Sequence, residues 1–355
     1  MKPFYKRILL SVTVFTAVSC SSVYEKVYPT LVDGKYDSEF PYNNSSKQLE
    51  EIGNTIKLLN SIAFYTGYVF EANSHYTDTD IKSIDIENAA IEKVYFNRTA
   101  SGTATIIYSD NEKIALLTVA HIVNFPDTII SHFVNPDGTF SEYVQSVSIK
   151  SKQSNYIPDL PHDSQLEIVA MDKNQDIAIL GTHARTAEIL SLPKFDYPWG
   201  KSSELEWGSF VYVMGFPMNF KMISKGIVSK PTKEKNSFLI DAVFNRGFSG
   251  GIVLAIRDGV PNFELVGLVR AVPSDFEYTI RPLTKEHDID YNPMIPYKGE
   301  VYVDKQQVLK LGITKVLGIE AVEDFLEKNR DILLHHGYYL KQFKTPAPIK
   351  FDVIH

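Results

Sequence analysis

The chain has 355 residues, 44% of them hydrophobic, and its formal net charge at pH 7 is −7. A chain of this length and composition can bury a sizeable core, and an all-β domain of about 200 residues is within normal single-domain size. The negative charge, with no long Lys/Arg cluster to reverse it, argues against a nucleic-acid partner.

The first residues have the pattern of a secretory signal. Lys2, Lys6 and Arg7 form a basic region, and an apolar stretch over residues 8–18 follows it. That stretch is too short for a stable membrane span, but its length is typical of a signal peptide. We therefore expect residues 1–19 to be a signal peptide.

The end of this stretch resembles the lipobox of bacterial lipoproteins. Residues 17–20 read Ala-Val-Ser-Cys, and Cys20 is the only cysteine, so no internal disulfide can form. The resemblance implies that Cys20 is lipidated and anchors the protein to the bacterial cell envelope without spanning a membrane. Because Ser21 and Ser22 follow, rather than aspartate, the outer membrane or the periplasmic face is favoured over the inner membrane. Ordinary signal cleavage nearby is the alternative.

Two segments precede the strand-rich middle of the chain. Residues 20–44 are polar and tyrosine-rich and contain prolines, which is typical of a tether. From Ser46 to about Tyr65, apolar residues recur at helical spacing. We therefore predict a helix there, packed on the following domain, within an N-terminal helical segment over residues 45–94.

Three separated motifs in the middle of the chain each contain one residue suited to proton transfer or nucleophilic attack. They are Leu-Thr-Val-Ala-His at 117–121, Asp-Ile-Ala-Ile-Leu at 176–180 and Gly-Phe-Ser-Gly-Gly at 247–251. A serine hydroxyl is a poor nucleophile unless an imidazole takes its proton, and the imidazole needs a carboxylate that fixes its tautomer. His121, Asp176 and Ser249 would supply these groups in that chain order.

The surroundings of the motifs suit these roles. A run of apolar and β-branched residues over 114–119 leads directly to His121, and Asp176 stands at the start of another short apolar run. Glycines on both sides of Ser249 allow a tight bend that can aim the amides of Gly247 and Ser249 at a developing oxyanion. The many short strands, separated by turns, favour a barrel or sandwich over a parallel sheet.

The histidine and serine motifs resemble those of the trypsin-like, chymotrypsin-fold serine peptidases, particularly the bacterial HtrA-type branch. Val-Tyr-Val-Met-Gly-Phe-Pro at 211–217 is similar to the family's apolar strand that ends in Gly-x-Pro. The resemblance covers roughly residues 95–275, the expected peptidase domain. It implies a mostly β fold with two six-stranded antiparallel β-barrels, to which the helical N-terminal and C-terminal extensions are added.

By this resemblance the site consists of the general base His121, its orienting carboxylate Asp176, the nucleophile Ser249 and an oxyanion hole formed by the amides of Gly247 and Ser249. The choice of aspartate stays open, because Asp163 and Asp172 lie in the same region. Asp176 is favoured because an apolar strand follows it directly. Phe248 stands where the family usually has Asp or Asn, so activation through an ion pair with a newly cut N-terminus is not expected.

A different fold offers a competing interpretation of the serine motif. Gly-Phe-Ser-Gly-Gly also matches the Gly-x-Ser-x-Gly nucleophile elbow of α/β-hydrolases, which needs an acid and a histidine downstream, and His287 and His335 are present there. An elbow should open a helix, however, and the segment after Ser249 has the pattern of a strand.

Residues 276–355 differ from the middle of the chain. The first part is charged and contains prolines, which is typical of a loop, and apolar residues recur at helical spacing from Val308 to Leu334. We predict a helix covering the catalytic domain, in an extension too short for a PDZ module. His335 and His336 would point to different faces of a helix end, with no Cys or carboxylate cluster nearby. No metal and no cofactor are expected.

The sequence thus predicts a membrane-anchored serine endopeptidase that cleaves polypeptides through an acyl-enzyme. By the family resemblance, Val243 and residues 270–272 lie near the first specificity pocket. The lack of an acidic residue there disfavours cleavage after Lys or Arg and favours a small or apolar side chain. The alternative is a catalytically inactive trypsin-fold lipoprotein that serves as a binding or scaffold component of the cell envelope. The oligomeric state stays open.

Overall fold

The structure, a computed structural model, describes most of the chain. The described residues are 32–41, 44–110, 113–135, 138–160, 165–183, 192–229, 236–242, 245–271, 274–282, 294, 301–309 and 312–343. The expected signal peptide, Cys20 and the first part of the expected tether lie outside them. Within the described ranges, no helix is both long and apolar enough to cross a membrane.

The first half of the fold is a seven-stranded antiparallel sheet with the strand order β4-β5-β1-β2-β3-β7-β6. Its strands are β1 (Ile56–Val69), β2 (Glu92–Ser109), β3 (Lys113–Thr118), β4 (Thr128–Val134), β5 (Phe140–Tyr156), β6 (Glu167–Asp172) and β7 (Ile177–His183). The inner strands β3 and β7 are fully paired from Lys113↔His183 to Thr118↔Ala178. This pairing brings the end of β3 beside the start of β7.

The second half is a six-stranded antiparallel sheet with the order β10-β15-β12-β11-β8-β9. Its strands are β8 (Phe210–Gly215), β9 (Met222–Ile227), β10 (Ser237–Ile240), β11 (Ile252–Ile256), β12 (Phe263–Ala271) and β15 (Thr314–Gly318), and a separate hairpin consists of β13 (Ser274–Pro282) and β14 (Val301–Leu309). The expected fold class is confirmed: two curled antiparallel sheets form half-barrels, as in a chymotrypsin-like double barrel. The first sheet has seven strands instead of the expected six.

The helices are short. They are α2 (Ser46–Asn54), α3 (Ile86–Ala89), α4 (Ala120–Val123), α5 (Ile319–Lys328) and α6 (Arg330–His335), and 3-10 turns cover Ala72–Ser74, Asp80–Lys82, Ser202–Glu204 and Pro217–Asn219. One apolar cluster joins the two half-barrels, because it contains buried residues of both sheets, such as Leu117 and Ile179 in the first and Leu254 and Leu268 in the second. A separate cluster, which includes Val211 and Val253, belongs to the second sheet.

The helix predicted from Ser46 to about Tyr65 is wrong in its second half. The helix α2 ends at Asn54, and the chain from Ile56 onward is β1. The Thr55 hydroxyl donates a hydrogen bond of 2.7 Å to the carbonyl of Ile52 at the point where the helix stops. Beyond it the chain is rich in β-branched and aromatic residues, which favour a strand when neighbouring strands are available on both sides. β1 has such neighbours in β2 and β5.

The helix predicted from Val308 to Leu334 is also wrong over its first part. That part contains the end of β14 and all of β15, and helix begins only at Ile319. Thr314–Gly318 pairs with both β10 and β12, so it completes the second sheet. A short apolar run of this kind fits a buried strand as well as a helix, and its place between two strands decides the outcome. The sheets therefore include β1 and β15, which lie outside the expected range 95–275.

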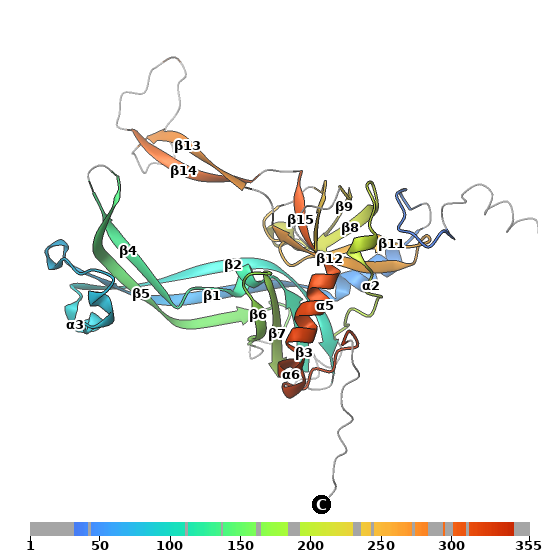
Figure 1. Cartoon of the computed structure of the whole chain (residues 1–355), viewed down its shortest axis with the longest axis horizontal. Coiled ribbons are helices and arrows are strands. Elements are labelled where there is room, and N and C mark those ends of the chain that lie inside the picture. Colours follow the sequence, from blue (N-terminus) through green and yellow to red (C-terminus); the bar gives the residue numbers. More distant parts are fainter. Residues whose placement is uncertain are drawn as a thin grey trace, which may run out of the picture.

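Part of the first sheet extends beyond the half-barrel as an arm made of β1, β2, β4 and β5 (Figure 1). β1, β2 and β5 have 14, 18 and 17 residues, whereas a typical strand has about 5–6. Near the α3 end of the arm, a small apolar cluster contains Phe70, Ile81, Val144 and Val147. β2 changes character along its length: residues 92–99 are all exposed and residues 102–107 are all buried.

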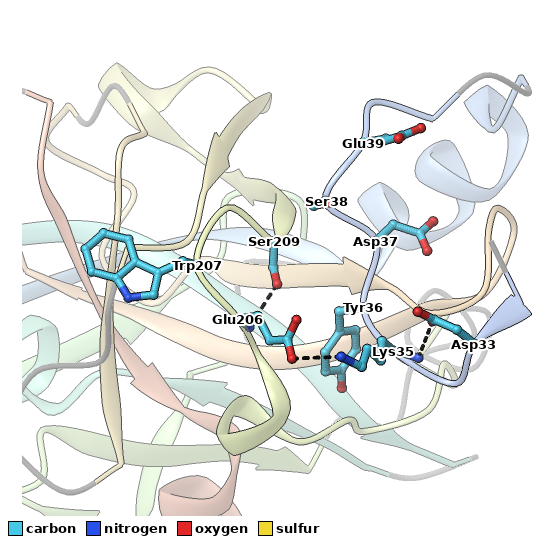
Figure 2. Close-up of a pocket in the computed structure, with 9 residues that line it drawn as sticks. All are labelled: Asp33, Lys35, Tyr36, Asp37, Ser38, Glu39, Glu206, Trp207 and Ser209. Carbon is cyan, nitrogen blue, oxygen red and sulfur yellow. Dashed lines mark hydrogen bonds and ion pairs between the residues drawn. The ribbon is translucent and has the colours of Figure 1, made fainter. Parts of the chain in front are cut away.

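The N-terminal segment that contains Tyr36 and Asp37 is bound to the second sheet. The Asp37 amide donates to the carbonyl of Ile256 at 2.9 Å, and its carbonyl accepts from the amide of Phe210 at 2.8 Å. The Tyr36 hydroxyl donates to a Glu264 carboxylate oxygen at 2.6 Å. Figure 2 shows this segment lining one side of a cavity, with Lys35 reaching across to Glu206.

Candidate active site

His121 lies in α4, the single helical turn that follows β3 directly. Its neighbours Ala120, Ile122 and Val123 are almost completely buried, and they fix the turn against the core. The His121 side chain, by contrast, is 47% exposed. Strand β3 and the buried face of α4 thus fix the backbone that carries the imidazole, and the imidazole itself lies at the surface.

Asp176 contacts His121 through both of its carboxylate oxygens. One oxygen, Oδ1, accepts the backbone amide of His121 at 2.8 Å, and the other, Oδ2, lies 2.9 Å from the imidazole Nδ1. The Asp176 side chain is 12% exposed. Because the pairing of β3 with β7 brings the start of β7 beside the end of β3, two residues that are 55 positions apart meet here.

Asp176 is the last residue of the turn between β6 and β7, and it adopts the left-handed conformation with a φ of 62°. Such a φ is uncommon for a residue with a side chain, although aspartate and asparagine tolerate it better than most. The two hydrogen bonds to His121 accompany this conformation. We therefore infer that the conformation of this turn places the Asp176 carboxylate against His121.

This contact determines how the imidazole is protonated when it is neutral. A carboxylate only accepts hydrogen bonds, so the Nδ1 atom beside it carries the proton. The other ring nitrogen, Nε2, then has a free lone pair and can accept a proton. The fold therefore presents a half-exposed imidazole with the tautomer that a general base requires.

Of the other two candidate aspartates, Asp163 lies outside the described residues, and the carboxylate of Asp172 has different partners. The Oδ1 atom of Asp172 accepts the amides of Asn174 and Gln175 at 2.9 and 3.1 Å. The amide of Gln175, then that of Asn174 and the ammonium of Lys328, lower the pKa of the Asp172 carboxyl. Asp172 therefore holds the turn that presents Asp176.

Ser249 follows a tight bend between β10 and β11. Gly247 has a φ of 107° and Gly250 a φ of 80°, both in the region that favours glycine. At Gly247 a Cβ atom would lie 2.2 Å from the carbonyl oxygen of Phe216, so only glycine fits. The Ser249 residue is partly exposed, between the buried residues Phe248 and Gly250.

The amides around Ser249 fall into two groups. Those of Phe248, Gly250 and Gly251 donate to the carbonyls of Asn245, Val269 and Phe248, respectively. Among the hydrogen bonds of the described residues, the amides of Gly247 and Ser249 donate none. These are the two amides that the family resemblance assigns to an oxyanion hole. An unpaired amide pair is the arrangement that a developing oxyanion requires.

Thr103, in the buried part of β2, joins the first sheet to the serine loop. Its hydroxyl donates to the carbonyl of Gly247 at 2.7 Å and accepts the amide of Phe216 at 2.9 Å, and its own amide donates to the carbonyl of Ser249 at 2.7 Å. Sequence reasoning did not identify this residue. A threonine in an apolar strand has no motif that reveals such a contact.

Arg270, near the end of β12, is a second residue of the candidate site whose contact with Asp176 sequence reasoning did not predict. Its Nε atom lies 3.5 Å from Asp176 Oδ2, and another guanidinium nitrogen donates to the carbonyl of Asn174 at 3.2 Å. The Asp176 carboxylate therefore lies between an imidazole and a guanidinium. Of the other residues expected near the first specificity pocket, Ala271 ends β12, and Val243 and Val272 lie outside the described residues.

The cavity in Figure 2 lies elsewhere and contains none of the predicted site residues. Its volume is about 220 Å³, and it is lined by the segment that contains Asp33 and Asp37 and by the segment from Glu206 to Ser209. Burial raises the pKa of the Asp37 carboxyl to about 6. The cavity is polar and acidic, and no residue in it has the arrangement of a nucleophile beside a base.

The competing interpretations of the sequence do not fit the structure. The residues after Ser249 lead into the strand β11, so the serine loop is not a nucleophile elbow of the α/β-hydrolase type. His287 lies outside the described residues. The rings of His335 and His336 lie 5.9 Å apart, and that of His336 stacks on Tyr338. Within the described ranges, no group of three or more His, Cys, Asp or Glu could hold a metal ion.

Comparison with known families agrees with the motifs. Residues 102–268 match the trypsin-like peptidase domain. Among solved structures, the chain is similar to the one titled "Crystal structure of Rv3671c protease, inactive form", with 16% sequence identity and a TM-score of 0.35. The match covers 64% of this chain and 83% of that chain. No match was found among curated proteins.

Proposed function

Because residues 102–268 match a trypsin-like peptidase domain, we propose that the protein is a serine endopeptidase, and the resemblance of its histidine and serine motifs supports the HtrA-type branch. His121 is the general base, Asp176 its orienting carboxylate and Ser249 the nucleophile. The observation that carries this proposal is the double contact of the Asp176 carboxylate with the backbone amide and the Nδ1 atom of His121.

In the proposed reaction, Ser249 Oγ attacks the scissile carbonyl of a polypeptide while His121 Nε2 takes the hydroxyl proton. The carbonyl oxygen becomes an oxyanion, and the amides of Gly247 and Ser249 donate to it. His121 then gives its proton to the leaving amine, which departs and leaves an acyl-enzyme. His121 then takes a proton from water, and the resulting hydroxide attacks the ester carbonyl. The bond between this carbonyl carbon and Ser249 Oγ breaks, and His121 gives the proton to Oγ.

We further propose that the enzyme is anchored to the bacterial cell envelope through a lipid on Cys20, at the outer membrane or the periplasmic face. The basic region, the short apolar stretch and the lipobox-like residues 17–20 support this. Growth with an alkyne-tagged fatty acid tests it. The chain should incorporate the label and sediment with membranes, Cys20→Ser should do neither, and Ser21→Ala should behave like the wild type. A wild-type chain that takes up no label contradicts the proposal.

The alternative is a catalytically inactive trypsin-fold protein that binds or organises other envelope components. One observation favours it: within the described residues, no hydrogen bond joins the Ser249 hydroxyl to His121. Catalytic hydrogen bonds are often long in free enzymes and tighten when substrate binds, so this gap is compatible with catalysis.

A fluorophosphonate probe separates the two functions, because it reacts covalently only with an activated serine. We expect the wild-type protein to be labelled and Ser249→Ala to be unlabelled. Ser131→Ala, an exposed serine in β4, is the matched control and should be labelled at the wild-type rate. A folded wild-type protein that is never labelled, or labelling that survives in Ser249→Ala, would overturn the proposed peptidase.

A further inference from the structure

The arm of the first sheet presents one strand edge without a partner. β2 pairs with β1 in a continuous register from Glu92↔Val69 to Thr105↔Ile56. On its other side, β2 pairs with β3 only between Thr105 and Ser109. Within the described ranges, no strand pairs with this second edge between residues 92 and 101.

The hydrogen bonds identify the backbone groups that point outward from this edge. The Ile106 amide donates to Thr55 on the β1 side, whereas the Thr103 amide donates to Ser249 on the opposite side. Backbone groups alternate between the two sides along a strand, and the β1–β2 register has no bulge to interrupt the alternation. The amides and carbonyls of Lys93, Tyr95 and Asn97 therefore face outward.

An exposed strand edge usually carries features that prevent pairing with another chain, such as a proline, a bulge or a lysine. Residues 92–99 contain no proline, this part of β2 has no bulge, and the charge of its one lysine, Lys93, is paired with Glu87. Three consecutive apolar residues also lie on this part of β2, Val94 and Phe96 on one face and Tyr95 on the other, and they are 39%, 37% and 72% exposed, respectively. The edge is thus long, regular and partly apolar.

We propose that this edge pairs with the same edge of a second copy of this chain, antiparallel and centred on Tyr95. The sequence Glu-Lys-Val-Tyr-Phe-Asn-Arg at 92–98 is complementary to itself in this register. Glu92 faces Arg98 of the second copy, Val94 faces Phe96, and Lys93 faces Asn97. The outward backbone groups of Lys93, Tyr95 and Asn97 then form the ladder between the copies.

The charges select this register. Glu92, Val94, Phe96 and Arg98 lie on one face of β2, so the apolar pairs are flanked on both sides by opposite charges. Within the described part of the chain, neither Glu92 nor Arg98 forms an ion pair of its own, whereas Lys93 is bound to Glu87 at 2.6 Å. A register centred on Asn97 would instead place Arg98 against Phe96 and leave Glu92 without an opposite charge.

Charge complementarity also favours a second copy of this chain over an unrelated strand as the partner of this edge. Backbone pairing alone accepts any extended segment, but both charges find partners only opposite a strand that carries the same two residues in reverse order. A two-fold axis at Tyr95 supplies that strand without any further requirement. This inference does not depend on the proposed peptidase activity.

Sedimentation equilibrium of the purified full-length protein, in detergent, at several concentrations tests the proposal. We expect a reversible dimer. Tyr95→Pro should abolish it, because proline removes an outward amide that β1 does not use. Tyr95→Leu is the matched control, because it keeps the outward amide, and it should keep the dimer.

A charge exchange gives the sharper test. Glu92→Arg and Arg98→Glu, each alone, place like charges opposite each other at both ends of the ladder and should weaken the dimer about tenfold or more. The double variant Glu92→Arg/Arg98→Glu restores opposite charges and should dimerise like the wild type. Mixing the two single variants should yield a heterodimer, because each carries the complement of the other.

Circular dichroism and thermal unfolding establish that each variant is folded. A wild-type protein that is monomeric at about 100 µM overturns the proposal, since edge pairing of this kind should reach at least micromolar affinity. So does a dimer that both single charge variants leave unchanged, because another surface would then form it. Recovery of the dimer in the double variant and in the mixture supports the register centred on Tyr95.

Discussion

The hydroxyl of Thr103 donates a hydrogen bond of 2.7 Å to the carbonyl of Gly247, although the two residues are 144 positions apart and belong to different halves of the fold. The same oxygen accepts the amide of Phe216. Thr103 itself is completely buried. One side chain of the first sheet therefore sets the position of the loop that carries Ser249, while His121 and Asp176 are held by that first sheet.

Thr103→Val should impair labelling more than it impairs folding. Valine keeps the shape but leaves the Phe216 amide and the Gly247 carbonyl without their buried partner, which costs about 1–3 kcal/mol of unfolding free energy. We expect the fluorophosphonate labelling rate to fall about tenfold or more as the loop shifts. A time course of fluorophosphonate labelling measures the labelling rate, and urea unfolding measures the free energy of unfolding.

Thr105→Val is the matched control, since Thr105 is also completely buried on β2 and its hydroxyl has no hydrogen-bond partner within the described residues. Replacing an unpartnered buried hydroxyl by a methyl group should be neutral or stabilising. Equal loss of labelling in both variants would mean that Thr103 acts through general packing.

Asp176→Asn should remove nearly all activity without unfolding the protein. The amide can no longer accept the Nδ1 proton in the same way, so the imidazole is no longer held in the tautomer with a free Nε2. Replacing such an orienting aspartate by asparagine lowers kcat by about 10⁴ in enzymes of this type. The rate of peptide cleavage or of fluorophosphonate labelling measures the loss.

Asp172→Asn removes the same charge from the same turn and keeps an oxygen that can accept the amides of Asn174 and Gln175. It should retain most of the wild-type rate. A reversed result, with Asp172 essential and Asp176 dispensable, would exclude the proposed triad.

Gly247→Ala should abolish labelling and destabilise the fold. The methyl group meets the Phe216 carbonyl oxygen at 2.2 Å, and the φ of 107° is itself unfavourable for alanine. Gly208→Ala provides the control, because Gly208 has a φ of 83° but no atom within 4 Å of the added methyl group. Urea unfolding of both variants separates the clash from the backbone strain. Equal destabilisation would show that the close approach of Phe216 contributes nothing.

Asp37→Asn should stabilise the protein at neutral pH. Burial raises the pKa of this carboxyl from 3.8 to about 6, so the folded state binds the proton more tightly than the unfolded state does. The group's contribution to stability is therefore greatest below pH 4 and is lost as the pH rises through 6. Above pH 6, the ionised Asp37 carboxylate lowers the free energy of unfolding by roughly 1–2 kcal/mol, after allowance for its partial exposure.

Thermal unfolding between pH 4 and 8 checks this prediction. The Tm of Asp37→Asn should exceed that of the wild type at pH 7.5 by several degrees, and the difference should shrink towards pH 4. Glu50→Gln makes the same charge change at an exposed position on α2 and should show no such pH-dependent gain. A gain at pH 4 that equals the gain at pH 7.5 would contradict the proposed cause.

The helix boundaries show where sequence patterns are ambiguous. Apolar residues from Ile56 to Ala63 fit both a helix and a strand, and the segment becomes β1 because β2 and β5 supply its hydrogen bonds. Thr314–Gly318 becomes β15 for the same reason, since β10 and β12 lie on either side of it. Propensity over a few residues is weaker than the bonds that two neighbouring strands provide.

The amino-acid sequence by itself determined a mostly β fold and three local motifs, because strand alternation, turns and glycine-rich bends depend on neighbouring residues, and the resemblance of those motifs to a known family implied the double barrel. The sequence also singled out His121, Asp176 and Ser249, but it left three aspartates open as the partner of the histidine. The tertiary structure decided which carboxylate contacts the imidazole, because the pairing of β3 with β7 sets that distance. It alone revealed Thr103 and Arg270, whose contacts cross between the sheets and leave no periodic signal in the chain.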